Sequence, residues 1–523
     1  MAGVVILPET TLKKLNARIL PQWKVCFFAG LLVGLLAHFY KLTNWLPNWD
    51  GLVFRYDPQN MIALGRWFLP VVCSFSSFYD LPFLNGLVAI VFHALSAVCI
   101  CRLLKVQSKI TACLIGAVIV SFPAVTSVMM YNYVADGYSI ACFLSTLAAL
   151  FMTRGKAGYY ALAAVLIALS MGIYQAYITV TIMLILLKLI DELLYHRADL
   201  GCVLKQSAFM LLTGILGAVL YTVVLNGLLA AFSVTLLDYQ GIGSSASLAA
   251  MDLRGSLYTV KETFLHCFFD LSGGVNLYVA LNAFLLLATA AYALRHSIQT
   301  KLYKKPVTLA AIPVLCVLLV IGAGALAFVN ASVDYHNLMR MGCAVFYLFF
   351  LILYERGADT NVKLVCARRW IVLLSALLLI ANQVVIANVS YHKAQMAYEK
   401  SYGVLMRIAD RIEQTPETAG CDKLLVLGAL DNSEAYSVNL TPDITGITDG
   451  YIIRADDESV NQSILCSALA DYCELDYEFL SGAEKQQFAQ RPEMQSMPVW
   501  PAAGCIAAMD DTLVIKLGSE GEM

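Results

Sequence analysis

The stretch LPNWDGLVFRYDPQNMIALGRWFLP, residues 46–70, carries two aspartates, two arginines and three tryptophan or tyrosine side chains. It follows an apolar run at about 23–40, which is long enough to cross a bilayer. Ionisable side chains next to lipid are costly unless they are paired or used. The stretch therefore indicates a membrane protein that keeps a polar, charged loop beside its first crossing.

The composition of the whole chain agrees with this interpretation. Hydrophobic residues make up 59% of the 523 residues, charged residues only 14%, and the mean hydropathy is +0.71. Because soluble domains are closer to a quarter charged, most of this chain is expected in lipid. The net charge of −2 argues against nucleic acid as a partner. The first apolar run lacks a small-residue cleavage pattern, so no cleavable signal peptide is expected.

The hydropathy pattern predicts a polytopic α-helical membrane protein with eleven transmembrane helices. The pair 158–173 and 176–191 is either two spans or one broken helix. The expected spans are 23–40, 83–101, 111–130, 138–152, 158–173, 176–191, 207–231, 276–294, 307–329, 341–355 and 370–389.

The distribution of positive charge predicts the orientation. With the N-terminus in the cytoplasm, the inner segments hold 19 lysines and arginines and the outer loops before the tail hold 6. This asymmetry favours a cytoplasmic N-terminus, and eleven crossings then place the C-terminal tail outside. Within the long outer loop 232–275, the segment that follows GIGSSAS is expected to form an amphipathic helix in the interface.

The chain is expected to divide into a transmembrane domain, residues 1–390, and a small extracytoplasmic α/β domain, residues 391–523. The tail begins with a predicted helix near 391–414, followed by strand patterns at 423–430 and 512–517. It contains four cysteines, which allow two disulfides in three pairings: Cys421, Cys466, Cys473 and Cys505. Without a CxxC or His/Cys cluster of zinc spacing, a structural metal is not expected.

Two aspartates of the opening stretch have different explanations. Asp57-Pro58 is typical of a helix start, with Asp57 as the N-cap, and this helix is expected to run to Leu69 and stop at Pro70. Asp50 lies on a turn between Pro47 and Gly51 and has no such structural explanation. It is either a functional carboxylate or a solvated loop residue between aromatic anchors.

Other polar residues at the predicted outer edge are also candidates. Arg66 either extends to the membrane surface or holds an anionic headgroup. The segment YNYVADGYS, residues 131–139, places Tyr131, Asn132, Tyr133 and Asp136 at one membrane edge, where they form either a site or an interfacial aromatic belt. Gln175 either hydrogen-bonds between helices, the alternative we favour, or contacts a sugar.

The segment NASVDYHNLMRM, residues 330–341, concentrates polar groups in a short loop. Arg340 stands at an outer helix end, against the positive-inside trend. Such a cation indicates an anionic ligand, for example a phosphate near the headgroups, and the alternative is a partner carboxylate such as Asp334.

The spacing of NWDG (48–51), GRW (65–67), PFLNGL (82–87) and MGIYQA (171–176) resembles the bacterial glucosyltransferase II family. This family includes serotype-converting O-antigen glucosyltransferases and belongs to the GT-C superfamily of integral membrane glycosyltransferases. The resemblance covers the membrane region and extends to the helix-then-strand start of the tail. It implies a GT-C-like fold in the bacterial cytoplasmic membrane.

The resemblance also implies an activity. The enzyme would transfer a hexose, expected to be glucose, from a polyprenyl-phosphate donor to a surface glycan or lipid-linked glycan on the outer face, with inversion. Asp50 would be the general base, and Arg66 and Arg340 would bind the donor phosphate. Candidate substrate contacts are Asp57, Trp67, Tyr131, Asp136, Gln175, Asp334, His336 and Asn337. Relatives differ in their use of a divalent metal, so Mg²⁺ or Mn²⁺ stays open as a cofactor.

Three other classes compete with this interpretation. A transporter or lipid flippase would place ionisable residues at mid-membrane depth and show repeat-related broken helices. A glycan polymerase or ligase would use a lipid-diphosphate oligosaccharide, so donor preference would distinguish it. A membrane scaffold without catalytic activity is the third.

Overall fold

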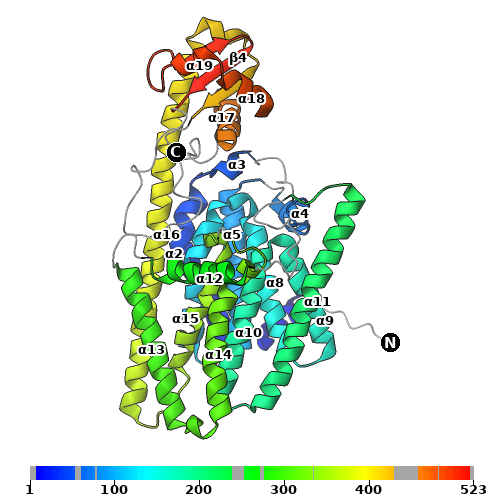
Figure 1. Ribbon diagram of the computed structural model, residues 1–523. Helices are drawn as coiled ribbons and strands as arrows, with labels where there is room; N and C mark the ends of the chain where they lie inside the picture. Colours follow the sequence, from blue (N-terminus) through cyan, green and yellow to red (C-terminus); the bar gives the residue numbers. More distant parts are fainter. Residues whose placement is uncertain are drawn as a thin grey trace.

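The computed structural model describes residues 8–53, 61–76, 79–237, 252–270, 276–333, 335–428, 458–480 and 482–518. A bundle of long helices makes up most of the chain, and a small α/β tail stands at one end of it (Figure 1). The face of the bundle next to the tail is called the tail-side face below, and it carries the short helices α3 and α4, Trp49–Val53 and Leu69–Cys73.

The remaining helices follow the chain in order. Those before residue 200 are α1 (Pro8–Arg18), α2 (Pro21–Thr43), α5 (Pro82–Leu103), α6 (Lys109–Ser121), α7 (Pro123–Met130), α8 (Asn132–Met152), α9 (Ala157–Ile173) and α10 (Ile178–Leu194). Those after it are α11 (Leu200–Phe232), α12 (Leu253–Phe268), α13 (Leu277–Gln299), α14 (Pro306–Ala323), α15 (Ala344–Leu351), α16 (Val362–Glu413), α17 (Glu458–Cys473), α18 (Gly482–Ala489) and α19 (Pro492–Ser496).

Seven of the described helices are long and apolar enough to cross a membrane, or eight if the bent pair α6 and α7 forms one span. Helical segments lie at all eleven predicted positions. However, α9 and α10 have 17 residues each and α15 only 8. At 1.5 Å per residue, 17 residues span about 26 Å, short of the roughly 30 Å hydrocarbon core. The count of eleven crossings is therefore not confirmed.

The two breaks in the bundle have local causes. Pro123 cannot continue the hydrogen-bond ladder of α6, so the chain bends by 41° and restarts as α7. The segment 158–191 forms two helices rather than one. Tyr174 is extended at φ −155°, and the 3-10 turn η2, Gln175–Tyr177, leads into α10.

Small residues let three helices approach closely. A Cβ atom on Gly30 of α2 would lie 3.1 Å from the Cβ of Ala94 in α5, and one on Gly116 of α6 would overlap the carbonyl oxygen of Cys26. Such contacts are typical of helix pairs in lipid, where close backbone approach replaces the hydrophobic driving force. Helices α11, α13 and α14 instead leave most of their apolar surface uncovered, as expected for helices that face lipid.

Two further predictions concern the tail-side face. The amphipathic helix is confirmed as α12, which lies across the bundle and buries one side, including Val260 and Phe268 (Figure 1). The helix predicted to end at Leu69 is wrong over its described part, because residues 61–68 form turns and loop instead. Gly65, at φ +74°, breaks the helix, and Pro70 lies in the first turn of α4, a position that proline fits.

The tail is built on an extension of the last long helix. Helix α16 has 52 residues and runs without a break through the expected boundary at residue 390. At 1.5 Å per residue it is about 78 Å long, more than twice the thickness of a bilayer core. Its second half carries the small α/β unit (Figure 1).

The tail sheet has the strand order β2-β1-β4-β3. Its strands are β1 (Lys423–Leu427), β2 (Glu478–Phe479), β3 (Ile506–Met509) and β4 (Thr512–Lys516). Strand β1 pairs in parallel with β2 and β4, and β3 pairs with β4 antiparallel. The two predicted strands are thus confirmed, and they are neighbours. All four tail cysteines are free thiols, so the disulfides that the sequence allows are not formed.

The close packing of α2 on α6 generates a stability prediction. Gly116→Ala should lower the free energy of unfolding by roughly 1–3 kcal/mol, because the added methyl group displaces the α2 backbone at Cys26. The thermal unfolding midpoint of detergent-purified protein measures this effect. Gly214→Ala is the matched control, since nothing lies within 4 Å of a Cβ at that position. Equal midpoints for the two variants would contradict the packing described here.

Candidate functional site

Asp50 lies on the single-turn helix α3, at the tail-side face. Asn48 begins this turn, because its side-chain Oδ1 atom accepts a hydrogen bond of 2.8 Å from the backbone N–H of Gly51. This is the capping role that asparagine commonly takes before a helix. Asp50 is half-buried, so part of the residue is accessible from outside the protein.

A second carboxylate lies directly behind this turn. Asp80 is 6% exposed, and its Oδ2 atom is 3.2 Å from the position that a Cβ on Gly51 would take. Its Oδ1 atom accepts a hydrogen bond of 2.6 Å from the side chain of Asn132, and the buried Lys41 lies within electrostatic range. A side chain at position 51 would therefore make a tight contact with this carboxylate, which glycine avoids. Asp80 thus lies close behind the turn that holds Asp50.

Tyr133, in the first turn of α8, is the centre of the site. It is 2% exposed, and the charged groups of Asp50 and Arg66 lie within electrostatic range of its hydroxyl. The hydroxyls of Tyr131 and Tyr138 lie within the same range. The structure thus brings together Asp50, Arg66 and Tyr131, three of the residues predicted from the sequence.

Arg66 turns into the protein rather than toward the membrane surface. It is 6% exposed, its Nη1 atom donates to the hydroxyl of Tyr138 at 3.3 Å, and its guanidinium lies 5.0 Å from the ring centroid of Tyr174. The rings of Tyr138 and Tyr174 stack at 4.8 Å. A guanidinium above an aromatic face keeps its charge available for an anion while most of its surface is covered.

The turn that carries Arg66 is fixed by side chains of other helices. Gln175 donates to the carbonyl of Leu64 and to the hydroxyl of Tyr221, both at 3.0 Å, and Tyr221 donates to the carbonyl of Gly65 at 3.0 Å. These contacts support the alternative in which Gln175 connects helices. Trp67 packs its ring against Gly172, where a Cβ would overlap the indole. Both residues thus position Arg66.

Asp136 is buried and accepts hydrogen bonds from other groups of the protein. It is 1% exposed, its Oδ2 atom accepts 3.0 Å from the hydroxyl of Ser76, and its Oδ1 atom accepts 2.9 Å from the backbone of Gly137 and lies 3.5 Å from the thiol of Cys73. These bonds hold the segment of α4 against α8. The contacts are those of a structural carboxylate rather than a substrate ligand.

Arg340 lies in a neighbouring loop, between the 3-10 turns η6, Asn337–Met339, and η7, Met341–Cys343. Its Nε atom donates to the carbonyl of Tyr335 at 2.7 Å and its Nη1 atom to the side chain of Asn337 at 3.3 Å. Among the described residues, none accepts a hydrogen bond from its Nη2 atom. Turn η6 packs against α7, which leads into Tyr131, so this loop adjoins the Tyr133 cluster. His336 precedes η6 and is half-buried.

The tail contacts the helix that carries Asp50. Leu52 is 2% exposed and belongs to the hydrophobic core of the tail, together with residues of α16 and α17 such as Leu405 and Leu469. Helix α17 packs against α3, and the indole N–H of Trp45 donates to the hydroxyl of Tyr472 at 3.1 Å. The position of Asp50 therefore depends on both the membrane bundle and the tail.

The described part of the chain contains no set of side chains that could hold a metal ion. No group of three or more His, Cys, Asp or Glu side chains comes together there. Asp50 lies on the turn, and Asp80 lies behind it. Asp80 already accepts a hydrogen bond from Asn132 and interacts electrostatically with Lys41. Two of the sequence-predicted site residues, Asp57 and Asp334, lie outside the described residues.

The sequence interpretation missed Asp80 and Tyr138, and for Asn132 and Tyr133 it left open whether they form a site or an interfacial belt. The available signal for Asp80 was its place at the other end of the outer loop that holds Asp50, just before the helix start Pro82. The tyrosines were visible only as members of an interfacial belt, because their shared contact with Arg66 joins segments that are far apart in the chain.

A family model described as "Glucosyl transferase GtrII" matches residues 39–353. This range includes Asp50, Asp80, Arg66 and Arg340 and ends before α16 and the tail. The match confirms the resemblance drawn from the sequence. No curated protein and no solved structure matches the chain.

The contact between Leu52 and the tail core generates a prediction. Leu52→Ala should loosen the tail from the bundle, because removing a buried leucine side chain costs roughly 2–5 kcal/mol. Limited proteolysis of the full-length protein should then cleave the tail faster than in the wild type. Leu36→Ala, at a position on α2 that is 60% exposed, is the matched control and should leave the cleavage rate unchanged. Identical rates for all three proteins would rule out this anchoring role.

Proposed function

We propose that this chain, which belongs to the glucosyl transferase GtrII family, is a multi-pass membrane glycosyltransferase whose active site is the tail-side cluster around Tyr133. The observation that supports the proposal is that a half-buried carboxylate, Asp50, and a buried cation, Arg66, both lie within electrostatic range of the same tyrosine, Tyr133. A carboxylate and a cation are the two charged groups that sugar transfer from a phosphate donor needs.

The proposed donor is a polyprenyl-phosphate hexose, with glucose favoured by the family name. The proposed acceptor is a surface glycan or a lipid-linked glycan. We place the reaction on the extracytoplasmic side of the bacterial cytoplasmic membrane, where the excess of lysine and arginine on the opposite side would put the tail and the Asp50 turn.

In the proposed reaction, Asp50 accepts the proton of an acceptor hydroxyl as that oxygen attacks the anomeric carbon of the donor. The bond between the anomeric carbon and the phosphate oxygen breaks, and its electron pair leaves with polyprenyl phosphate. Attack from the face opposite the leaving group inverts the configuration. The half-buried position of Asp50 is consistent with this role, because a residue that is partly accessible to solvent can be reached by an acceptor.

The departing phosphate gains negative charge, which fixed cations can stabilise. Arg66 is pre-oriented by Tyr138 and Tyr174, and Arg340 is pre-oriented by Tyr335 and Asn337. Neither guanidinium would need to reorganise during transfer, and a planar guanidinium suits phosphate oxygens. A divalent metal enters none of these steps. Tyr131, which lies near Tyr133, and His336 and Asn337, which lie in the same loop as Arg340, are proposed as acceptor or sugar contacts.

The assignment of Asp50 as the base predicts that Asp50→Asn abolishes transfer, because an amide cannot accept the proton. The assay supplies membranes with labelled polyprenyl-phosphate glucose and measures incorporation into glycan. Asp410→Asn is the matched control, since this exposed aspartate bonds only Gln414 among the described residues, and it should retain activity. Wild-type activity in Asp50→Asn protein with an unchanged unfolding midpoint would refute the assignment.

The assignment of Arg340 to the donor phosphate predicts a selective defect. Arg340→Ala should raise the KM for the donor about tenfold or more, given the usual strength of hydrogen bonds to charged groups, and leave the KM for the acceptor nearly unchanged. Arg254→Ala removes an exposed arginine at the start of α12 and should change neither constant. Equal increases in both constants for Arg340→Ala would argue against a phosphate role.

A further inference from the structure

A second polar site lies at the end of the bundle opposite the tail. There a cavity of about 320 Å³ opens between the ends of α2, α5, α8, α10 and α11. Its lining includes Trp23, Arg102, Lys105, Arg154, Lys188 and Glu192. This is a different face from the Asp50 cluster, since α5 and α8 each run the length of the bundle between the two, and the proposed transfer reaction uses none of these residues.

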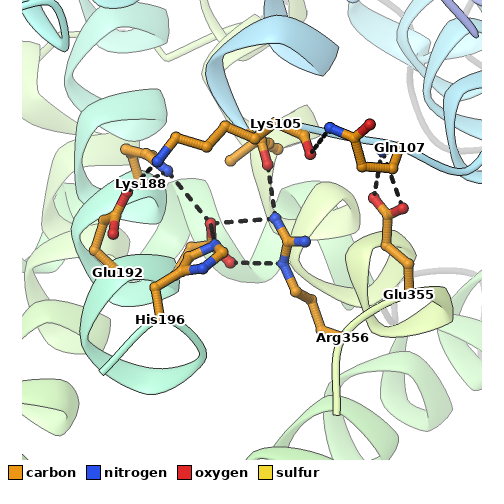
Figure 2. Close-up of polar contacts among 9 residues, drawn as sticks. Lys105, Gln107, Lys188, Glu192, His196, Glu355 and Arg356 are labelled. Atoms are coloured by element: carbon orange, nitrogen blue, oxygen red, sulfur yellow. Dashed lines mark hydrogen bonds and ion pairs between the residues drawn. The ribbon is translucent and has the colours of Figure 1, made fainter. Parts of the chain in front are cut away.

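Part of the charge around the cavity is neutralised internally (Figure 2). Glu192 accepts ion pairs from Lys105 at 3.3 Å and from Lys188 at 2.7 Å. Asp191 lies 3.5 Å from Lys188 and 3.0 Å from the Nε atom of Arg356. This network ties α5 and α10 to the loop after α15 and fixes one wall of the cavity.

Two arginines of the cavity have no acidic partner among the described residues. The guanidinium of Arg102 lies 5.5 Å from the ring centroid of Trp23, and Arg154 is an exposed residue just after α8. With Lys105 and Lys188, the lining holds four cations against the single carboxylate Glu192. The cavity therefore presents a local excess of positive charge with two guanidinium groups that can bind an anion.

The location favours a lipid as the source of that anion. The cavity lies at the ends of α2, α5 and α8, three helices that are long and apolar enough to cross a membrane. The Trp23 indole is the amphipathic type of side chain that occupies the headgroup level. Basic pockets between helices at this level commonly bind anionic headgroups. We propose that this cavity binds the phosphate group of an anionic phospholipid, held by Arg102 and Arg154 and bordered by the Lys105–Glu192–Lys188 network.

Titration of detergent-purified, full-length protein tests this proposal through its unfolding midpoint. The probes are phosphatidylglycerol, phosphatidylcholine and inorganic phosphate. Phosphatidylglycerol should raise the midpoint in a saturable way and phosphatidylcholine should not, because its headgroup has no net charge. In Arg102→Gln/Arg154→Gln protein, half-saturation should need about tenfold more phosphatidylglycerol or greater, since two charge-assisted contacts are lost.

Two further variants serve as controls. Lys304→Gln/Lys305→Gln removes two exposed charges from the same face outside the cavity and should titrate like the wild type. Arg102→Lys/Arg154→Lys keeps the charges and should retain most of the response, which separates a binding defect from misfolding of the Gln variant.

Two results would overturn the proposal. An equal response of the cavity variant and the Lys304/Lys305 control would show a nonspecific effect of surface charge. A saturable response to inorganic phosphate with none to phosphatidylglycerol would assign the cavity to soluble phosphates instead of lipid.

Discussion

The cost of placing polar groups beside lipid is the constraint on which the tail-side face depends. In the loop between α2 and α5, the polar groups reduce this cost by forming hydrogen bonds within the protein. Lys41 donates to the carbonyl of Leu46 at 2.7 Å, and Asn132 connects Asp80 to Asn85 through hydrogen bonds of 2.6 and 2.9 Å. This paired layer lies close to Gly51, and of the two carboxylates Asp80 is buried whereas Asp50 is half-buried. The proposed site therefore combines two carboxylates in different environments. Asp80 is buried and hydrogen-bonded to Asn132, and Asp50 is half-buried.

The same principle links the site to the tail. A single-turn helix such as α3 has too few internal hydrogen bonds to be stable alone, and it is held by Asn48 on one side and by burial of Leu52 in the tail on the other. The long helix α16 extends beyond the bundle and holds the tail where its core can contact Leu52. The tail therefore helps to position Asp50. It lies outside the residues matched by the family model, so the proposed site depends on a part of the chain that this model does not include.

Sequence reasoning identified the membrane class, the helical positions and both predicted tail strands, because these depend on local apolar patterns. It also proposed Asp50 and Arg66 as site residues, and the structure places both near Tyr133. It placed a helix through residues 61–68 because it treated Pro70 as a stop rather than a start. It also missed Asp80, since the partner that buries this carboxylate, Asn132, lies 52 positions away. Sequence reasoning favoured a hydrogen bond of Gln175 between helices, but it could not name the partners. Those partners, the use of Asp136 inside the protein and the docking of Leu52 on the tail depend on tertiary contacts that no local pattern contains.

The most direct test of the account is a cryo-electron microscopy map of the full-length protein with bound polyprenyl phosphate, the proposed leaving group. The account predicts phosphate density within hydrogen-bonding distance of Arg66 or Arg340, with Asp50 facing the adjacent space where the acceptor would enter. Phosphate density that is distant from both arginines, with the tail-side cluster unchanged, would contradict the proposed site.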